Sequence, residues 1–420
     1  MGLPSMLRRL EMRECKNLKS LPEGMMQNNT SLKYLAIRKC HSLKSFPRGG
    51  LPTSLEYLHI YDCSSLESLP EGMQNNTSLK ELTIGKCHSL TSFPSGIWLP
   101  NTTLKSLWIR DCKNLESLPE GLHNLTSLDN LYINDCPLLI TFPSEGFPTK
   151  LKYLDINCCN TESLLEVLRN LTSLDNLAIG GCPALISFPA KALTSISIYS
   201  CKNLKFLPNC MHSLTSLQYL FIAECPSLLS FQELPNNITK LNIQNCKNLK
   251  AMPYRMHNLA SLQHLIIRSC PSLSFPEEGL PTNLAHLVIQ DCENLEQPLF
   301  EWGMQRLTSL ACFDIGTSSR IESFSKLLLP ITVTKFTIEN MPNLKSLPNG
   351  LHNLTSLEEL KIFKCPNLAS FSKEGLPTML CCLRIADCPL LSQRFQKGKG
   401  IDWPKLAHIP RIEIDRELVI

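Results

Sequence analysis

The chain has 420 residues, of which 43% are hydrophobic and 19% charged, and its formal net charge is +4 at pH 7. This apolar content excludes an intrinsically disordered chain, and the small net charge argues against a protein that holds nucleic acid mainly by neutralising phosphates. The 20 cysteines and 29 prolines stand beside only 7% aromatic residues. Such a bias indicates either a disulfide scaffold or a motif that uses cysteine and proline once per repeat.

A leucine-rich phrase recurs from the start of the chain almost to its end. It reads L-x-x-L-x-M-x-x-C-x-x-L-x-x-L-P from Leu7 and returns in the same frame from Leu32. The mean period is roughly 23 residues, which is typical of leucine-rich repeats and explains a length that would otherwise predict several domains. The first apolar residues of the 17 units are Leu7, Leu32, Leu55, Leu79, Leu104, Leu128, Leu151, Leu174, Leu193, Leu217, Ile238, Leu262, Leu284, Leu310, Val333, Leu357 and Leu380.

Each unit predicts one short strand followed by a return arm. In the third unit Leu58 and Ile60 fall on one face of the strand, and Tyr57, His59 and Tyr61 on the other. A lone unit buries about six apolar side chains, too few to offset the ordering of about 23 residues, so the units must stack.

The sequence therefore predicts an α/β repeat solenoid. We expect a leucine-rich-repeat horseshoe with a concave parallel β-sheet of about 17 strands and short helical or irregular convex segments. Residues 1–395 would form the solenoid and residues 396–420 a C-terminal capping tail. The return arms are of two alternating kinds, so the true period is often a pair of units, roughly 48 residues long.

Three units depart from the frame. The unit from Leu151 lacks the usual proline, and the units from Leu310 and Val333 carry Ser318 and Met341 in place of the frame cysteine. We expect irregular curvature at these places.

The repeat explains the cysteines, because fifteen of them fall on one frame position. Disulfide frameworks use varied spacings, and structural zinc sites need close C-x-x-C pairs, which this chain lacks. A ladder of buried, reduced thiols is therefore predicted, which favours a reducing compartment, the cytoplasm or the nucleus. The frame cysteines are Cys15, Cys40, Cys63, Cys87, Cys112, Cys136, Cys159, Cys182, Cys201, Cys225, Cys246, Cys270, Cys292, Cys365 and Cys388.

No targeting segment contradicts this interpretation. The first ten residues lack a signal-peptide core, and no apolar run approaches the 18 or so residues of a membrane span. Most glycosylation sequons belong to the recurring N-L-T-S-L or N-N-T-S-L phrase, and we interpret them as frame residues, not glycan acceptors.

Three segments carry a family resemblance: residues 104–115 (LKSLWIRDCKNL), residues 118–128 (LPEGLHNLTSL) and residues 400–415 (GIDWPKLAHIPRIEID). They resemble the C-terminal repeats and the ending of plant intracellular disease-resistance receptors of the nucleotide-binding leucine-rich-repeat class, most closely its coiled-coil branch. The resemblance covers essentially the whole chain. It implies a recognition region that binds a pathogen effector or a guarded host protein, and that restrains the nucleotide-binding domain of the parent receptor.

One departure from that family concerns nucleotide binding. The first repeat begins at Leu7, and no G-x-x-x-x-G-K-[ST] loop occurs. We therefore expect nucleotide-driven switching to lie outside this chain, which is either a fragment, a truncated gene product or a repeat-only protein. No cofactor and no metal site are expected.

Aromatic side chains gather at the outward strand positions. Large rings on the concave sheet are typical anchors for a protein partner, although tyrosine also favours half-buried strands for purely structural reasons. The candidate partner-binding residues are Tyr34, Tyr57, His59, Tyr61, Trp108, Tyr132, Tyr153, Tyr199, Tyr219 and Phe221.

Basic side chains are concentrated in the first 50 residues, where ten lysines and arginines face three glutamates. They are either a solvated surface or a candidate interdomain patch that meets an acidic surface of the nucleotide-binding domain. Nucleic acid is not an expected partner, because no recognised binding motif organises these charges. The patch comprises Arg9, Arg13, Arg38 and Lys39.

No constellation indicates an enzyme. The sequence contains neither H-E-x-x-H nor G-x-S-x-G, and the off-frame thiols Cys158, Cys381 and Cys382 have no sequence-identifiable base. Two functions stay open: the recognition and autoinhibitory region of an immune receptor, and a non-immune structural or adaptor repeat protein.

Overall fold

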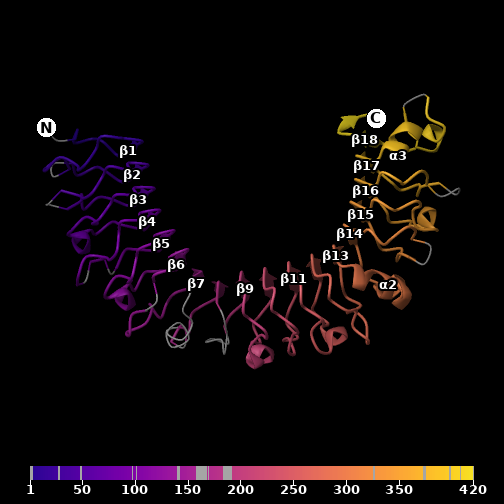
Figure 1. Cartoon of the computed structure of the whole chain (residues 1–420), viewed down its shortest axis with the longest axis horizontal. Helices are drawn as coiled ribbons and strands as arrows, with labels where there is room; N and C mark the ends of the chain where they lie inside the picture. Colours follow the sequence, from indigo (N-terminus) through magenta and orange to yellow (C-terminus); the bar gives the residue numbers. More distant parts are fainter. Residues whose placement is uncertain are drawn as a thin grey trace. The chain divides into compact units, whose positions relative to one another are not determined.

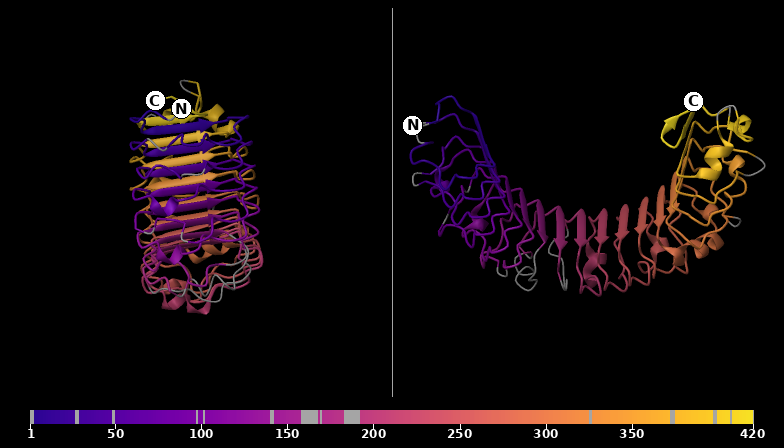
Figure 2. Two further views of the ribbon diagram at one scale, coloured as in Figure 1. Left: turned by 90° about the vertical axis from the view of Figure 1, so that its left-hand side faces the viewer. Right: turned by 45° about the horizontal axis from the view of Figure 1, so that its top comes forward.

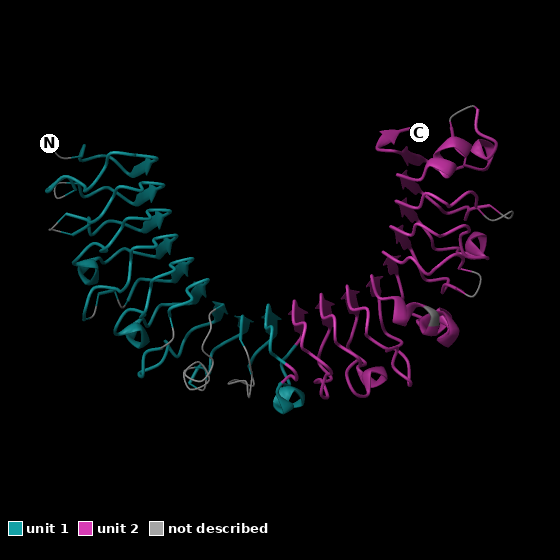
Figure 3. Cartoon of the chain, viewed as in Figure 1, with its two compact units in different colours: residues 1–204, 208–217 teal, residues 205–207, 218–420 magenta. Residues whose placement is uncertain are grey.

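A computed structural model places most of the chain. It describes residues 3–26, 29–47, 50–96, 98–100, 102–139, 142–157, 168, 170–182, 192–324, 327–371, 375–396, 399–406 and 408–419. The chain divides into two compact parts, each made of many repeats, which Figure 3 colours separately and which we call unit 1 and unit 2. Unit 1 holds residues 1–204 and 208–217, and unit 2 holds residues 205–207 and 218–420.

Unit 1 is a stack of parallel strands that follow one another in chain order (Figure 1). Its described strands are β1 (Arg9–Arg13), β2 (Tyr34–Arg38), β3 (Tyr57–Tyr61), β4 (Glu81–Gly85), β5 (Ser106–Arg110), β6 (Asn130–Asn134), β7 (Tyr153–Asn157), β8 (Asn176–Gly180) and β9 (Ser195–Tyr199).

Unit 2 repeats the arrangement and ends in one antiparallel pair, β18 with β19. Its described strands are β10 (Tyr219–Ala223), β11 (Lys240–Gln244), β12 (His264–Arg268), β13 (His286–Gln290), β14 (Cys312–Gly316), β15 (Lys335–Glu339), β16 (Glu359–Phe363), β17 (Cys382–Ala386), β18 (Arg411–Ile414) and β19 (Glu417–Leu418).

Register follows the repeat. Leu58 pairs with Leu82 and Ile60 with Ile84, so each apolar position continues into the next strand, and all four side chains are fully buried. Each of the 17 predicted units supplies one described strand, from β1 to β17. The prediction of a leucine-rich-repeat solenoid with a parallel sheet and little helix is confirmed.

In each repeat the return arm connects the end of one strand to the start of the next (Figure 2), and several of these arms contain a short helical turn. A glycine with positive φ precedes several of them, such as Gly72 (φ 74°) before a turn that buries Met73. The described 3-10 turns are η1 (Met73–Asn75), η2 (Leu122–Asn124), η3 (Asn209–Ser213), η4 (Met256–Asn258), η5 (Met304–Arg306), η6 (Leu351–Asn353) and η7 (Trp403–Leu406). The described α-helices are α2 (Glu293–Trp302) and α3 (Pro389–Arg394).

The two kinds of arm differ at one buried position. In the N-N-T-S-L arm, buried Asn76 donates to the Pro52 carbonyl at 3.0 Å and accepts from the Leu79 amide at 2.7 Å. In the other kind of arm, which begins at Phe46, buried Pro52 holds that position, and its backbone carbonyl accepts from the Leu55 amide. The alternation predicted from the sequence therefore corresponds to two packing solutions.

Most of the described strands end in a left-handed residue followed by the frame cysteine. Asp62 has φ 60°, and its amide donates to the Gly85 carbonyl of the next strand. The chain then turns inward, so that the Cys63 thiol is buried and donates to the Tyr61 carbonyl at 3.7 Å.

The described frame cysteines are free thiols, and all of them except half-buried Cys15 are buried. Burial raises the pKa of Cys63 to about 11 and that of Cys87 to about 12. These thiols therefore stay protonated and poorly nucleophilic at neutral pH. Cys158 and Cys159 lie outside the described residues.

Ser318, which replaces a frame cysteine, has an unusual partner. It is 1% exposed, and its hydroxyl donates to Oε2 of Glu296 on α2 at 2.7 Å. Met341 fills the other exceptional position and is fully buried. The curvature expected at these units and beyond Leu151 stays a prediction.

The end of the chain continues the sheet of unit 2. Strand β18 pairs with β17 in parallel, and β19 folds back on β18 through a left-handed turn at Asp415 and Arg416. Asp402 is 4% exposed and bonds to both Arg394 and Lys405. The proposed boundary between solenoid and tail at residue 395 stays a prediction.

Candidate partner-binding surface

All ten predicted aromatic residues lie on the face of the sheet that points away from the leucine core, which we call the outer face. Eight of them belong to unit 1, whereas Tyr219 and Phe221 belong to unit 2. Each of them is half-buried. The rings cover one another, because strands in register place outward side chains about 5 Å apart.

The first aromatic cluster spans β2 and β3. Tyr34 lies 6.4 Å from Tyr57 and 5.2 Å from His59 between ring centroids. The His59 Nδ1 is 3.1 Å from the Thr83 hydroxyl, and burial lowers the pKa of His59. This imidazole is therefore largely neutral at pH 7 and belongs to the packed surface.

Cations of the chain already cover this first cluster. The Arg9 guanidinium lies 3.8 Å above the Tyr34 ring, and the Lys86 ammonium lies 5.7 Å from the Tyr61 ring. The Arg38 guanidinium donates to the Tyr34 hydroxyl at 3.3 Å. Cation–π contacts of this kind fix ring orientation.

The second cluster runs along β5, β6 and β7. Trp108 and Tyr132 stack with centroids 3.3 Å apart and an interplanar angle of 5°. Tyr153 follows, with its ring 4.9 Å from that of Tyr132. Three rings from consecutive strands therefore form one continuous aromatic row, which we call the Trp108 row.

A carboxylate that the sequence analysis missed stands beside this row. Asp155 on β7 accepts a hydrogen bond from the Tyr199 hydroxyl at 2.8 Å and one from the Asn134 amide at 3.3 Å. Burial raises the pKa of Asp155 despite these bonds. Desolvation and the neighbouring Asp155 charge raise the pKa of Tyr199.

Gly180 makes the bond between Tyr199 and Asp155 possible. The Tyr199 ring on β9 crosses β8 to reach β7, and a Cβ at Gly180 would lie 2.5 Å from the Tyr199 Cε2 atom. Gly85 likewise leaves room for the Tyr61 ring, since a Cβ at Gly85 would lie 2.6 Å from the Tyr61 Cδ2 atom. The sequence signal for this contact was a glycine at an outward strand position that pairs in register with a tyrosine on the neighbouring strand.

The outer face of unit 2 is more polar. The Lys240 ammonium lies 5.2 Å from the Tyr219 ring, and His264 stacks on His286 at 4.4 Å. Farther along, Glu359 pairs with Lys361 at 3.1 Å and with Arg384 at 3.6 Å. Tyr219 and Phe221 are thus followed by charged and imidazole groups, not by a second row of rings.

The predicted basic patch lies on β1 and β2 but is partly neutralised. Glu11 is 3.5 Å from Arg9 and 3.7 Å from Arg38, while Glu14 is 3.4 Å from Arg13 and 3.5 Å from Lys39. Four cations therefore share two carboxylates. The patch adjoins the first aromatic cluster, because Arg9 belongs to both.

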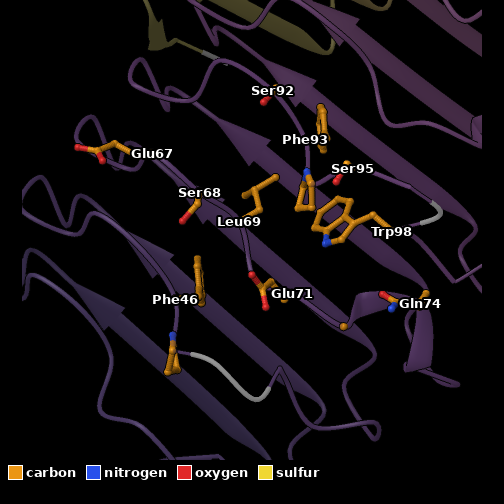
Figure 4. A pocket seen from close by; sticks show the side chains of 13 residues that line it. Phe46, Glu67, Ser68, Leu69, Glu71, Gln74, Ser92, Phe93, Ser95 and Trp98 are labelled. Atoms are coloured by element: carbon orange, nitrogen blue, oxygen red, sulfur yellow. The ribbon is translucent and has the colours of Figure 1, made fainter.

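The return arms of unit 1 carry a separate open pocket of about 470 Å³ (Figure 4). Its wall includes Phe46, Phe93 and Trp98, and the Trp98 indole donates to the Pro70 carbonyl at 2.7 Å. Residues in the matching positions two units later, including Phe142, line a second pocket. These pockets repeat with the arms and lie away from the aromatic row.

Metal binding and membrane insertion are two other functions on which the described residues bear. They contain no group of three or more histidine, cysteine or acidic side chains placed to hold a metal ion. None of their helices has both the length and the apolarity that a membrane span requires.

Stacked coils of one strand each, with leucine ladders, left-handed strand ends and return arms, define a leucine-rich-repeat fold. A solved leucine-rich-repeat protein of Leptospira interrogans, LIC12759, is similar across 98% of this chain and 96% of its own, with a TM-score of 0.59 and 20% identity. The circular leucine-rich-repeat protein CroV588 aligns with a TM-score of 0.41 and 19% identity, covering 98% of this chain and 73% of its own. The likeness to the Leptospira protein agrees with this fold and shows no more than the fold.

One curated relative is similar in sequence. The "Putative disease resistance protein At3g14460" of Arabidopsis thaliana is 36% identical over 143 residues. The match covers 33% of this chain and spans 10% of the relative's length. No family model matches the chain.

Proposed function

We propose that this chain is the recognition region of a plant immune receptor and that it binds a protein partner on the outer face of its sheet. The similarity to a protein named for disease resistance supports the immune part of the proposal. The partner would be a pathogen effector or a guarded host protein, met in the cytoplasm or the nucleus. Reduced frame cysteines agree with such a compartment.

The Trp108 row is the observation that carries the binding proposal. Its three rings are held in place by stacking, so a partner that covers them gains apolar contact area without the entropic cost of ordering flexible side chains. Tryptophan and tyrosine dominate the energetics of protein interfaces for this reason. Tyr57 in the first cluster would extend the contact, and Tyr219 of unit 2 is a separate candidate.

Alanine variants test this surface. The quadruple variant of Tyr57, Trp108, Tyr132 and Tyr219 should lose partner binding, measured by surface plasmon resonance against a protein captured from infected leaf tissue and then purified. Tyr254→Ala is the matched control, because Tyr254 is 61% exposed and lies in a return arm. If the quadruple variant keeps its circular-dichroism melt and binds the partner as tightly as wild type, the outer face is not the binding surface.

The basic patch supports a second element, restraint of a nucleotide-binding domain. Two carboxylates leave the four cations with a net positive field that an acidic domain surface would complement. Charge reversal at Arg9, Arg13 and Arg38 should weaken association with a co-expressed nucleotide-binding domain, and salt should weaken the wild-type association likewise. A salt-independent association would remove the electrostatic explanation.

The alternative is a non-immune adaptor that uses the same surface. Its support is that the Trp108 row suits a protein partner of either kind. An adaptor should capture the same partner from uninfected tissue and leave cell death unaffected when it is expressed in leaves. An immune region joined to its parent receptor should instead alter the cell-death response.

A further inference from the structure

The chain supplies its own cations to several of its aromatic rings. Among the described residues, a lysine or arginine lies over the rings of Tyr34, Tyr61 and Tyr219 on the strands, and over those of Tyr254 and Trp302 outside them. No such cation lies over the Trp108 row in the part of the chain that the structure describes. The ring faces that this row leaves open are therefore not covered by a cation of the described chain.

The carboxylate beside the row also has no ion-pair partner among the described residues, and the Arg110 charge acts on it only from farther away. Three other carboxylates that are largely covered each pair with at least two cations: Glu56 with Lys33 and Lys80, Glu359 with Lys361 and Arg384, and Asp402 with Arg394 and Lys405. Asp155 has only neutral donors among the described residues, the Tyr199 hydroxyl and the Asn134 amide. A partly desolvated anion whose direct hydrogen-bond donors are neutral gains from a cation placed in contact with it.

The rings and the carboxylate lie within reach of one side chain. Asp155 pairs in register with Tyr132 on the neighbouring strand, and Tyr153 stands two residues earlier on the same face of β7. Outward groups related in these ways lie about 5 to 7 Å apart. An arginine guanidinium is flat enough to stack on Tyr153, the ring at the end of the row, while donating to a carboxylate oxygen.

We infer that the Trp108 row and Asp155 together form a site for an arginine side chain of the partner protein. This inference rests on the proposed function and names the chemistry of its partner. The site is preorganised, because Tyr199 lies across Gly180 and holds the carboxylate in place before the partner arrives. Each carboxylate oxygen accepts one neutral hydrogen bond and retains a lone pair for the guanidinium.

The probe is the peptide acetyl-Gly-Gly-Arg-Gly-Gly-amide, compared with the same peptide carrying citrulline. Citrulline keeps the planar shape and loses the charge. Both are titrated into the full chain labelled with nitrogen-15 in its tryptophans, and the Trp108 indole signal, assigned with Trp108→Phe, reports binding. We expect saturable shifts with roughly fivefold to tenfold tighter binding of the arginine peptide.

Substitution at Asp155 tests the origin of that preference. Asp155→Asn should make the two peptides bind equally, while Glu71→Gln, which removes one negative charge from an exposed return arm, should leave the preference unchanged. Tyr199→Phe removes the hydrogen bond that holds the carboxylate in place, so it should weaken arginine binding while leaving a preference over citrulline. Equal affinities in wild type, no shift with either peptide, or equal losses in the Asp155 and Glu71 variants would overturn the inference.

These outcomes are separable from failure of the proposed function. If the arginine preference is absent but the alanine variants still lose the partner, only the cation site is wrong. If the preference is present and the alanine variants bind normally, the site exists but does not serve the proposed partner.

Discussion

Replacing Glu296 by glutamine should remove a pH-dependent loss of folding stability from unit 2. Glu296 lies on α2 and is 2% exposed. Its Oε2 accepts from Ser318, while its Oε1 is buried without a partner among the described residues. A carboxylate in this position loses its hydration and gains one hydrogen bond in return.

The size of the effect follows from the protonation of this group. Burial is the main cause that raises the pKa of Glu296 from its ordinary 4.5 to about 7, and Glu293 and Asp291 add to the rise while Ser318 and Arg320 oppose it. The folded chain therefore binds more protons than the unfolded chain between these two pH values. Its free energy of unfolding should fall as pH rises through this window, by about 3 kcal/mol in all.

Urea unfolding, followed by circular dichroism at pH 5 and pH 8, measures the difference. Wild type should be less stable at pH 8 through this group, and Glu296→Gln should recover most of that loss while changing little at pH 5. Glu277→Gln, on an exposed return arm, controls for the lost charge. If Glu296→Gln is no more stable than wild type at pH 8, the buried carboxyl is not the source of a penalty.

Three further predictions concern single positions. Gly180→Ala should displace the Tyr199 ring and cost about 1 to 2 kcal/mol in urea unfolding, and an unchanged midpoint would contradict the close contact. Asn76→Ala should cost about 2 kcal/mol, because it leaves the buried Leu79 amide without its acceptor and removes one of two donors to the Pro52 carbonyl, whereas exposed Asn75→Ala should lie within about 0.5 kcal/mol of wild type. Iodoacetamide at pH 8 should alkylate exposed Cys381 well before buried Cys63 and Cys87, as read by peptide mass spectrometry; equal rates would mean that the frame thiols are accessible.

The strands could be predicted because one physical rule repeats. Leucine and isoleucine alternate at Leu58 and Ile60 and return at Leu82 and Ile84, so burial and register follow from the period alone. The left-handed strand ends could not, since residues as different as Lys39 and Asp62 adopt them. The path of the chain imposes that conformation, and residue type does not reveal it.

The candidate surface was predicted in its membership but not in its contacts. Strand alternation places Tyr132 and Tyr153 on the outer face, yet it does not say that rings on adjacent strands cover one another. The hydrogen bond from Tyr199 to Asp155 joins residues 44 positions apart. It is possible only because Gly180, which lies between them, has no side chain. Such a contact arises from three strands together, so no single repeat encodes it.

The alternating return arms limit how the length of this chain could change. Arms at matching positions two units apart line equivalent pockets, one around Phe93 and one around Phe142. Removing a single unit would place two arms of the same kind side by side, whereas removing a pair restores the same neighbours on both sides. Unequal exchange between copies of the gene should therefore preserve packing in steps of roughly 48 residues, and length variants should differ by even numbers of repeats.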